Sequence, residues 1–134
     1  MKLQVGVKVL LQNEKNEYLF LRRAEAFHNE IEPHWDIPGG RIDPDETLDI
    51  ALKREIMEET SLRIDDDFKL VAAQDIMVAT KDLHVVRLTY SASGTGEVTT
   101  SDEHQEIRWV TRDEALHLNL DPYLHEVLAE LMQP

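Results

Sequence analysis

The 134-residue chain contains no cysteine, which excludes disulfide bonds and thiolate metal sites. It has no apolar run near the roughly 18–20 residues that a membrane span needs, so we expect no association with membranes. Basic residues are scarce, since 14 Lys and Arg stand against 27 Asp and Glu for a net charge of −13. This balance argues against a protein that holds DNA or RNA through broad phosphate contacts, so we expect no nucleic acid partner.

The composition that remains is typical of one soluble globular unit. Hydrophobic residues make up 42% of the chain and charged residues 31%, and the length fits a single domain over residues 1–134. The first residues, "MKLQVGVKVLL", alternate like a strand and lack a small-residue cleavage site, so they do not predict a signal peptide. Together with the absence of cysteine, this favours a cytoplasmic protein.

The order of the predicted elements indicates an α+β fold. Strands are expected over 3–11, 17–23, 35–40, 68–80, 83–92 and 106–110. A helix is expected over 47–60, another opens at the capping box of Thr111 and Glu114, and a terminal helix follows Asp121-Pro122. We therefore expect a mixed sheet sandwiched between helices.

Acidic residues gather on the helix predicted over 47–60. With Glu55 at zero on the helical wheel, Glu59 falls near +40° and Glu58 near −60°, on the stripe that also carries Leu48, Ala51 and Leu52. Ile50 and Met57 lie on the opposite side, so we expect the helix to be covered on both sides. The three glutamates therefore extend the inward face of the helix.

Carboxylates on an inward face are unfavourable unless they are paired or bind a metal. Arg54 lies near −100°, at the margin of the acidic group, and we expect it to neutralise one glutamate rather than three. A divalent cation would satisfy the others, and oxygen-only ligands suit Mg²⁺ or Mn²⁺, with Ca²⁺ as a further option. The sequence thus predicts a metal site on this helix.

The segment from Gly40 to Leu62, "GRIDPDETLDIALKREIMEETSL", resembles the signature box of the Nudix hydrolase family. Eight of the nine fixed positions of the box agree in spacing and residue type: Gly40, Glu46, Arg54, Glu55, Ile56, Glu58, Glu59 and Leu62. Ser61 stands where the family has glycine. The chain is identified as similar to small, single-domain members of the MutT type, with the Nudix fold.

The resemblance implies a Mg²⁺-dependent pyrophosphohydrolase that cleaves a phosphoanhydride bond in a nucleoside diphosphate derivative. A nucleoside triphosphate, including an oxidised one, is the expected substrate, and Mn²⁺ could replace Mg²⁺. The implied metal ligands are the carboxylates of Glu55, Glu58, Glu59 and Glu103 and the main-chain carbonyl of Gly39. Arg54 would orient a glutamate, and Glu46 would hold the loop before the helix. The protein would be a monomer or a homodimer.

The general base remains open between two glutamates. Glu58 lies in the box, and Glu103 stands where MutT-type members place a further glutamate near the metals, with Glu106 as a substitute for it. Arg22 and Arg23 are candidate phosphate contacts, and because neighbours on a strand face opposite sides, only one can reach the site. The resemblance favours Arg23. Other candidate substrate contacts are Asn119, through its side-chain amide, and Trp35 and Phe27, for which core packing is the favoured use.

Within this hypothesis, ADP-ribose or a nucleotide sugar is the alternative substrate, although Met77 occupies the position where ADP-ribose members carry proline. Two further classes compete with the hypothesis itself. One is a nucleotide-sensing module of the same fold without turnover, which a degraded metal cluster would favour. A calcium-binding protein has little support, because the acidic run at 65–67 is too short for an EF-hand loop. Glycine at a helix end adopts the left-handed conformation freely, so we expect Ser61→Gly to gain stability and keep its turnover.

Overall fold

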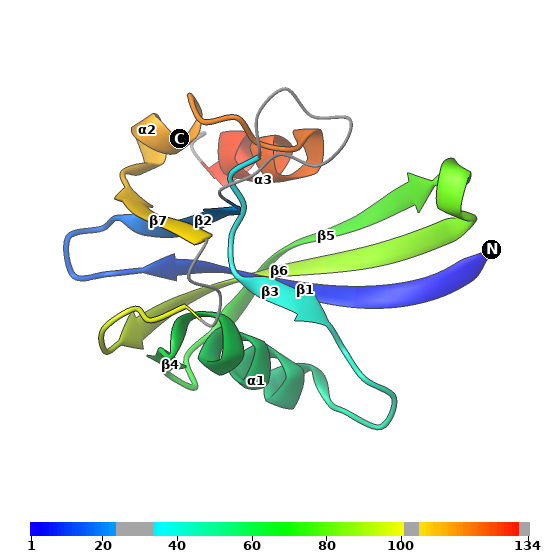
Figure 1. Cartoon of the computed structure of the whole chain (residues 1–134), viewed down its shortest axis with the longest axis horizontal. Helices are drawn as coiled ribbons and strands as arrows, with labels where there is room; N and C mark the ends of the chain where they lie inside the picture. Colours follow the sequence, from blue (N-terminus) through cyan, green and yellow to red (C-terminus); the bar gives the residue numbers. More distant parts are fainter. Residues whose placement is uncertain (24–33, 101–104, 132–134) are drawn as a thin grey trace.

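The computed structural model describes residues 1–23, 34–100 and 105–131 (Figure 1). Within these ranges the strands form one mixed sheet of seven in the order β4-β6-β1-β2-β7, with β3 paired to β1 and β5 paired to β6. The elements are β1 (Lys2–Gln12), β2 (Tyr18–Arg23), β3 (Gly39–Arg41), α1 (Leu48–Thr60), β4 (Arg63–Ile64), β5 (Lys69–Val78), a 3₁₀ turn (Ala79–Lys81), β6 (Leu83–Thr95), β7 (Gln105–Val110), α2 (Arg112–Ala115) and α3 (Pro122–Leu131).

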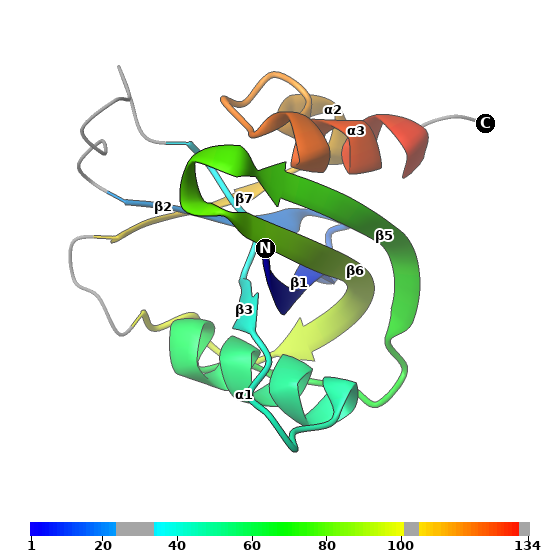
Figure 2. The same cartoon turned by 90° about the vertical axis from the view of Figure 1, so that its right-hand side faces the viewer.

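The helices cover the sheet from opposite sides (Figure 2). Because neighbouring side chains on a strand alternate, Val7, Val9 and Leu11 of β1 pack in the core next to α1, whereas Leu10 packs in a second core next to α2 and α3. The predicted α+β sandwich is therefore confirmed.

The sheet opens between β1 and β2, and the chain around β3 fills the opening. The two strands pair only at Gln12↔Tyr18. Further along, Asp36 exchanges two backbone hydrogen bonds with Leu21 of β2, at 2.8 and 2.9 Å, and the Pro38 carbonyl accepts one from Val9 of β1 at 2.9 Å. The segment is thus held from both sides, and it carries Gly39 and Gly40 to a position beside α1.

Helix α1 ends at Thr60 as the sequence predicts and begins one residue later than predicted, because Thr47 is its N-cap residue. It packs on the sheet through Ala51, Leu52, Ile56 and Thr60, all fully buried. The expectation that both sides are covered is wrong. Ile50 is 56% exposed and Met57 40% exposed, because no described element packs against the outer side of the helix. Leu48, on the inward side but at the first position of the helix, is also 37% exposed.

The strand predictions are confirmed with changes at their ends, except that the strand expected over 35–40 is wrong for 35–38, where only Asp36 forms an isolated bridge and β3 begins at Gly39. β6 runs on to Thr95, into residues expected to form a turn, and β4 was not predicted because two residues carry too little pattern. Thr111 and Glu114 form the expected capping box, and the Asp121 carboxylate caps α3 by accepting from the Leu124 N–H at 2.8 Å. None of the helices in the described part of the chain combines the length and the apolar character that a bilayer crossing requires.

Candidate active site

The three glutamates of α1 differ in how far they are buried. Glu55, whose side chain is 14% exposed, and the half-buried Glu59 border the sheet, whereas the Glu58 side chain is 60% exposed. This side of the helix packs on the sheet through the neighbouring buried residues Leu52 and Ile56. The prediction that the acids extend the inward face is confirmed for Glu55 and Glu59 and wrong for Glu58.

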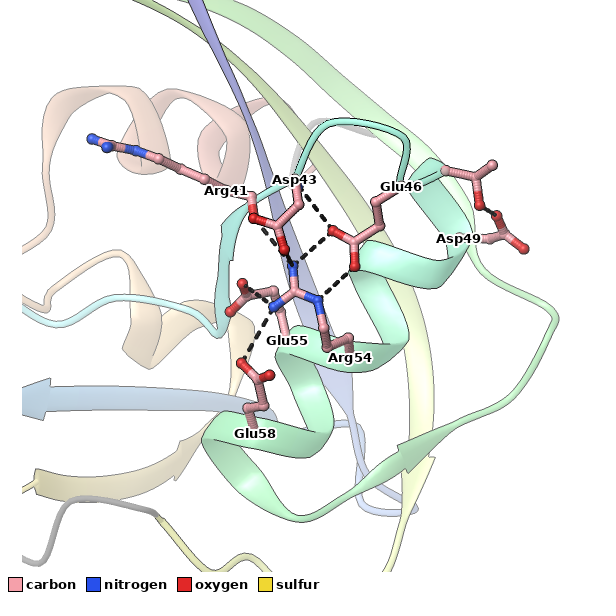
Figure 3. A network of polar contacts seen from close by, with 8 residues as sticks. Arg41, Asp43, Glu46, Asp49, Arg54, Glu55 and Glu58 are labelled. Carbon is pink, nitrogen blue, oxygen red and sulfur yellow. Dashed lines mark hydrogen bonds and ion pairs between the residues drawn. The ribbon is translucent and has the colours of Figure 1, made fainter.

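Arg54 is the centre of a dense group of acids, which we call the Arg54 cluster: Asp43, Glu46, Arg54, Glu55 and Glu58 (Figure 3). Its Nε donates to Glu46 Oε2 at 2.6 Å and its Nη2 to Glu46 Oε1 at 2.8 Å, so this pair is bidentate. Its Nη1 donates to Glu55 at 2.8 Å and to Glu58 at 3.3 Å. Arg54 therefore donates to three glutamates, because its fork has five donors, while its single charge can neutralise only one of them, as expected.

The cluster stabilises the charged forms of Glu46 and Arg54. The hydrogen bonds from Arg54, and a further one from the Asp43 N–H, lower the pKa of Glu46 to about 2. The pKa of Arg54 is raised in turn, chiefly by Glu46 and then by Glu55. Arg54 Nη2 also donates to the Arg41 carbonyl at 3.3 Å, while the Arg41 side chain points away from the cluster (Figure 3). These contacts fasten the loop before α1 to the helix, the role expected of Glu46.

Glu59 lies in a different setting, which we call the Glu59 corner: Lys8, Asp36, Gly39 and Glu59. Its carboxylate accepts one hydrogen bond from the Gly39 N–H at 3.3 Å. Burial raises the pKa of Glu59 to about 7, against the opposing effect of the Lys8 charge and the Gly39 hydrogen bond, and Glu55 and Asp36 raise it further. Glu59 is therefore an acid whose charge the described residues only partly offset.

The backbone at Gly39 and Gly40 lies against these carboxylates and strands. A Cβ atom at Gly40 would lie under 3.0 Å from the Glu55 carboxylate, and one at Gly39 would lie under 3.0 Å from the Val7 carbonyl and Lys8. At Gly39 the obstacle is backbone, so only glycine permits the approach, whereas a side chain at Gly40 would displace the Glu55 carboxylate. The Gly39–Gly40 backbone and the Glu55 and Glu59 carboxylates thus share one small space.

This donor set fits a hard divalent cation. Carboxylate and carbonyl oxygens are the ligands of Mg²⁺ and Mn²⁺. A bound cation would stabilise the charged form of Glu59 and so lower its raised pKa. Among the described residues, no three acidic or histidine side chains converge as a metal cage, and Arg54 binds both Glu55 and Glu58. Binding an ion would therefore require Glu55 and Glu58 to exchange contacts with Arg54 for contacts with the metal.

Ser61 occupies the left-handed conformation that glycine would adopt, with φ +64°. Its N–H donates to the Met57 carbonyl at 3.0 Å and closes the helix, and its hydroxyl donates to the Thr99 carbonyl at 3.0 Å. The Thr99 N–H donates to the Thr60 carbonyl at 2.8 Å. The hydrogen bond of the serine hydroxyl therefore offsets part of the strain that glycine would avoid, and it joins the end of α1 to Thr99.

The two arginines of β2 face opposite sides, as expected. Arg22 stacks over the Trp35 ring at 4.5 Å and pairs with Glu106 at 2.8 Å, on the side of the sheet that packs against α3. By alternation, Arg23 follows Leu19 and Leu21, whose side chains face α1. Arg23 is thus the arginine on the acidic side. Glu106 cannot substitute for Glu103 there, because its pairing with Arg22 places it on the opposite side.

Trp35 and Asn119 lie together. Trp35 is 7% exposed and belongs to the core next to α3, so the core-packing prediction is confirmed. The Trp35 backbone N–H donates to the Asn119 backbone carbonyl at 2.8 Å. This contact places the half-buried Asn119 on the same side as Arg22 rather than beside the acids of α1. Glu103 and Phe27 lie outside the described residues.

Lys8 and Asp36 were missed as members of the site. Lys8 Nζ donates to Asp36 Oδ2 at 2.8 Å and to the Ile37 carbonyl at 3.4 Å, and the Lys8 side chain is only 18% exposed. A signal was present, since a lysine interrupts the apolar run "VGVKVLL" of a strand that is buried on both faces. A charge at such a position needs a partner, and Asp36 is four residues before Gly40.

Comparison with known proteins agrees with this geometry. The family model described as NUDIX domain matches residues 2–131. A nucleoside triphosphatase NudI of an Enterobacter strain is 32% identical over 98 residues, which cover 65% of this chain and 68% of that protein. A MutT-like protein of Streptomyces ambofaciens is 28% identical over 128 residues, covering 95% of this chain and 76% of that protein.

Solved structures show the same architecture. The crystal structure of a MutT protein from Methanosarcina mazei superposes with a TM-score of 0.78 at 28% identity, covering 96% of this chain and 91% of that one. The solution structure of the Escherichia coli ORF135 protein gives a TM-score of 0.79 at 24% identity, covering 98% of this chain and 90% of that one, which shows the fold alone. The chain belongs to the NUDIX domain family, as an enzyme that hydrolyses pyrophosphate bonds.

Proposed function

We propose that this enzyme is a Mg²⁺-dependent nucleoside triphosphate pyrophosphohydrolase whose substrates include oxidised nucleotides. The observation that carries the proposal is the shared space of the Gly39–Gly40 backbone and the Glu55 and Glu59 carboxylates. The similarity to a nucleoside triphosphatase and to MutT proteins supports the choice of substrate class. We further propose a cytoplasmic protein that is a monomer or a homodimer.

In this proposal Glu55, Glu58, Glu59 and the Gly39 carbonyl would hold Mg²⁺, with Mn²⁺ as a substitute. The ion would neutralise charge on the phosphates and activate water. Other residues of the chain hold these ligands in place. Arg54 and Glu46 hold the loop that leads into α1, and the bonds from β1 and β2 hold the Gly39–Gly40 backbone. Arg23, on the same side of the sheet, would contact the phosphates.

Glu58 and Glu103 remain the two candidates for the general base. Glu58 is exposed, and its one hydrogen bond among the described contacts comes from Arg54 at 3.3 Å, so it can turn toward an attacking water. A base must come within hydrogen-bond reach of the proton that it removes. The pH profile of kcat for Glu58→Gln and Glu103→Gln separates them, since loss of the base removes the acidic limb of the profile.

A substrate screen tests the proposed function. Purified protein with Mg²⁺ would be offered nucleoside triphosphates, an 8-oxo-purine triphosphate, ADP-ribose and a nucleotide sugar, and pyrophosphate and phosphate release would be followed. Glu59→Gln should lose activity, while Glu130→Gln on the exposed side of α3 serves as the matched control. Preference for ADP-ribose or the sugar would contradict the proposed substrate, and activity unchanged in Glu59→Gln would contradict the site.

A further inference from the structure

Lys8 is an unusual neighbour for a metal site, because it already brings a positive charge to it. It lies in the middle of β1, directly opposite Gly39 in the register of β1 and β3. Its aliphatic stem packs so closely on Gly39 that a Cβ there would lie under 3.0 Å from it. The stem thus fixes the direction in which the ammonium group points, along the segment from Asp36 to Gly39.

The ammonium group has two fixed partners on that segment. It donates to Asp36 Oδ2 at 2.8 Å and to the Ile37 carbonyl at 3.4 Å. Asp36 is held in turn by the Ile37 N–H, which donates to its Oδ1 at 2.8 Å. Because the Lys8 side chain is 18% exposed, water screens this charge less than it would on the surface. The charge also acts on Glu59, whose pKa it lowers.

We propose that Lys8 is a resident cation of the Glu59 corner, which offsets the charges of Asp36 and Glu59 in the metal-free protein and weakens binding of the divalent ion. The inference rests on the proposed function, since it concerns the same metal site. Lys8 is a positioning residue here, because it acts through Glu59 and the Gly39 backbone. The consequence is an ion that binds tightly only when the phosphates of the substrate add their negative charge.

The simpler explanation is that Lys8 and Asp36 only tether the segment to β1. The two explanations predict opposite signs for one variant. Lys8→Met keeps the stem against Gly39 and removes the charge. If Lys8 competes with the ion, this change strengthens metal binding, whereas loss of a tether would loosen Gly39 and weaken it. Asp36→Asn keeps the Oδ1 acceptor, removes a negative charge, and should weaken metal binding.

Binding of Mn²⁺ to the metal-free protein at pH 9 under argon, without nucleotide, is the test, because loss of the Lys8 charge raises the pKa of Glu59 and a proton on Glu59 would oppose the ion at lower pH. Electron paramagnetic resonance would measure free Mn²⁺ for the wild type, Lys8→Met, Lys8→Arg and Asp36→Asn. We expect binding about 3- to 10-fold tighter in Lys8→Met, unchanged in Lys8→Arg and several-fold weaker in Asp36→Asn, as the sign of each removed charge requires. Should Lys8→Met fail to fold, Lys8→Gln removes the charge and keeps a donor for the Ile37 carbonyl.

The outcomes separate this inference from the proposed function. If the wild type binds Mn²⁺ and both uncharged variants bind it equally or more weakly, the resident-cation inference is wrong and the metal site stands. If the wild type takes up no Mn²⁺ even with a nucleotide present, the proposed function fails and the inference fails with it. Tighter binding in Lys8→Met, together with wild-type affinity in Lys8→Arg, supports the inference.

Discussion

The Arg54 cluster and the Glu59 corner solve the same problem in different ways. Both bring carboxylates to the partly buried side of α1. Glu46 receives two hydrogen bonds from Arg54 and has a pKa of about 2, whereas Glu59 receives one from a backbone N–H and has a pKa of about 7. The difference teaches that Glu46 is satisfied within the chain, by Arg54 and the Asp43 N–H. Glu59 leaves a charge for a cation from solution, and so do Glu55 and Glu58, which share the remaining donors of Arg54.

The largest expected effect is that of Glu59→Gln on turnover. Loss of a proposed metal ligand should lower kcat/KM by at least about 100-fold. Stability should change in the opposite direction: at pH 8 the metal-free variant should be more stable by about 1–2 kcal/mol, because a desolvated charge is removed. Steady-state kinetics and chemical unfolding measure the two. A variant that loses both activity and stability would show that Glu59 is structural.

Breaking the Arg54 cluster should lower stability, and it should lower turnover less than Glu59→Gln does. Glu46→Gln keeps the size of the side chain but weakens its bidentate pairing with Arg54, so unfolding should occur at a lower temperature, by on the order of 5 °C. Turnover should fall by roughly 10-fold, since Arg54 positions the helix glutamates. Glu130→Gln, on the exposed side of α3, is the matched control and should change neither. A Glu46→Gln variant as stable as the wild type would show that the pairing with Arg54 adds no stability.

The two groups should also give opposite dependence of stability on pH in the metal-free protein. Glu59 has a folded-state pKa raised from 4.5 to about 7, so its ionisation destabilises the fold as pH rises through that window, by on the order of 2 kcal/mol after allowing for partial exposure. Glu46 has a pKa lowered to about 2, so its contribution is present above about 4.5 and is lost as pH falls toward 2.

Thermal unfolding across pH 2–9 measures both limbs. Glu59→Gln should flatten the neutral limb, Glu46→Gln the acidic limb, and saturating Mg²⁺ should reduce the neutral limb in the wild type by binding the folded state. Neutral limbs of equal slope in the wild type and Glu59→Gln would mean that the burial of Glu59 has no effect on folding.

The smallest effect is expected at Ser61, at the end of the same helix. Glycine would relieve the strain of the left-handed conformation but lose the hydrogen bond to the Thr99 carbonyl. The free energy of unfolding of Ser61→Gly should therefore be within about 0.5 kcal/mol of the wild-type value, rather than higher by the whole strain energy. Ser61→Ala keeps the strain and loses the bond, and should be less stable by about 1 kcal/mol. Urea unfolding distinguishes them, and a Ser61→Ala variant clearly more stable than the wild type would mean that the Ser61 hydroxyl does not stabilise the helix end.

The positions of several site residues could be predicted from the sequence. Helical periodicity placed Glu55 and Glu59 beside Leu52, and strand alternation separated Arg22 from Arg23, because both depend only on local geometry. The exposure of Ile50 and Met57 depends on what packs from elsewhere in the chain, which periodicity does not contain. Lys8 and Asp36 meet only because the segment around β3 enters the opening between β1 and β2.

Calorimetric titration of Mg²⁺ or Mn²⁺ into chelator-treated protein, alone and with a non-hydrolysable nucleotide, tests the central claim most directly. The claim is that the carboxylates of α1 beside Gly39 and Gly40 are completed by a divalent cation. We expect uptake by the wild type and by Glu130→Gln, and at least about 10-fold weaker uptake by Glu59→Gln. Equal binding by all three proteins, or no uptake by any of them, would contradict it.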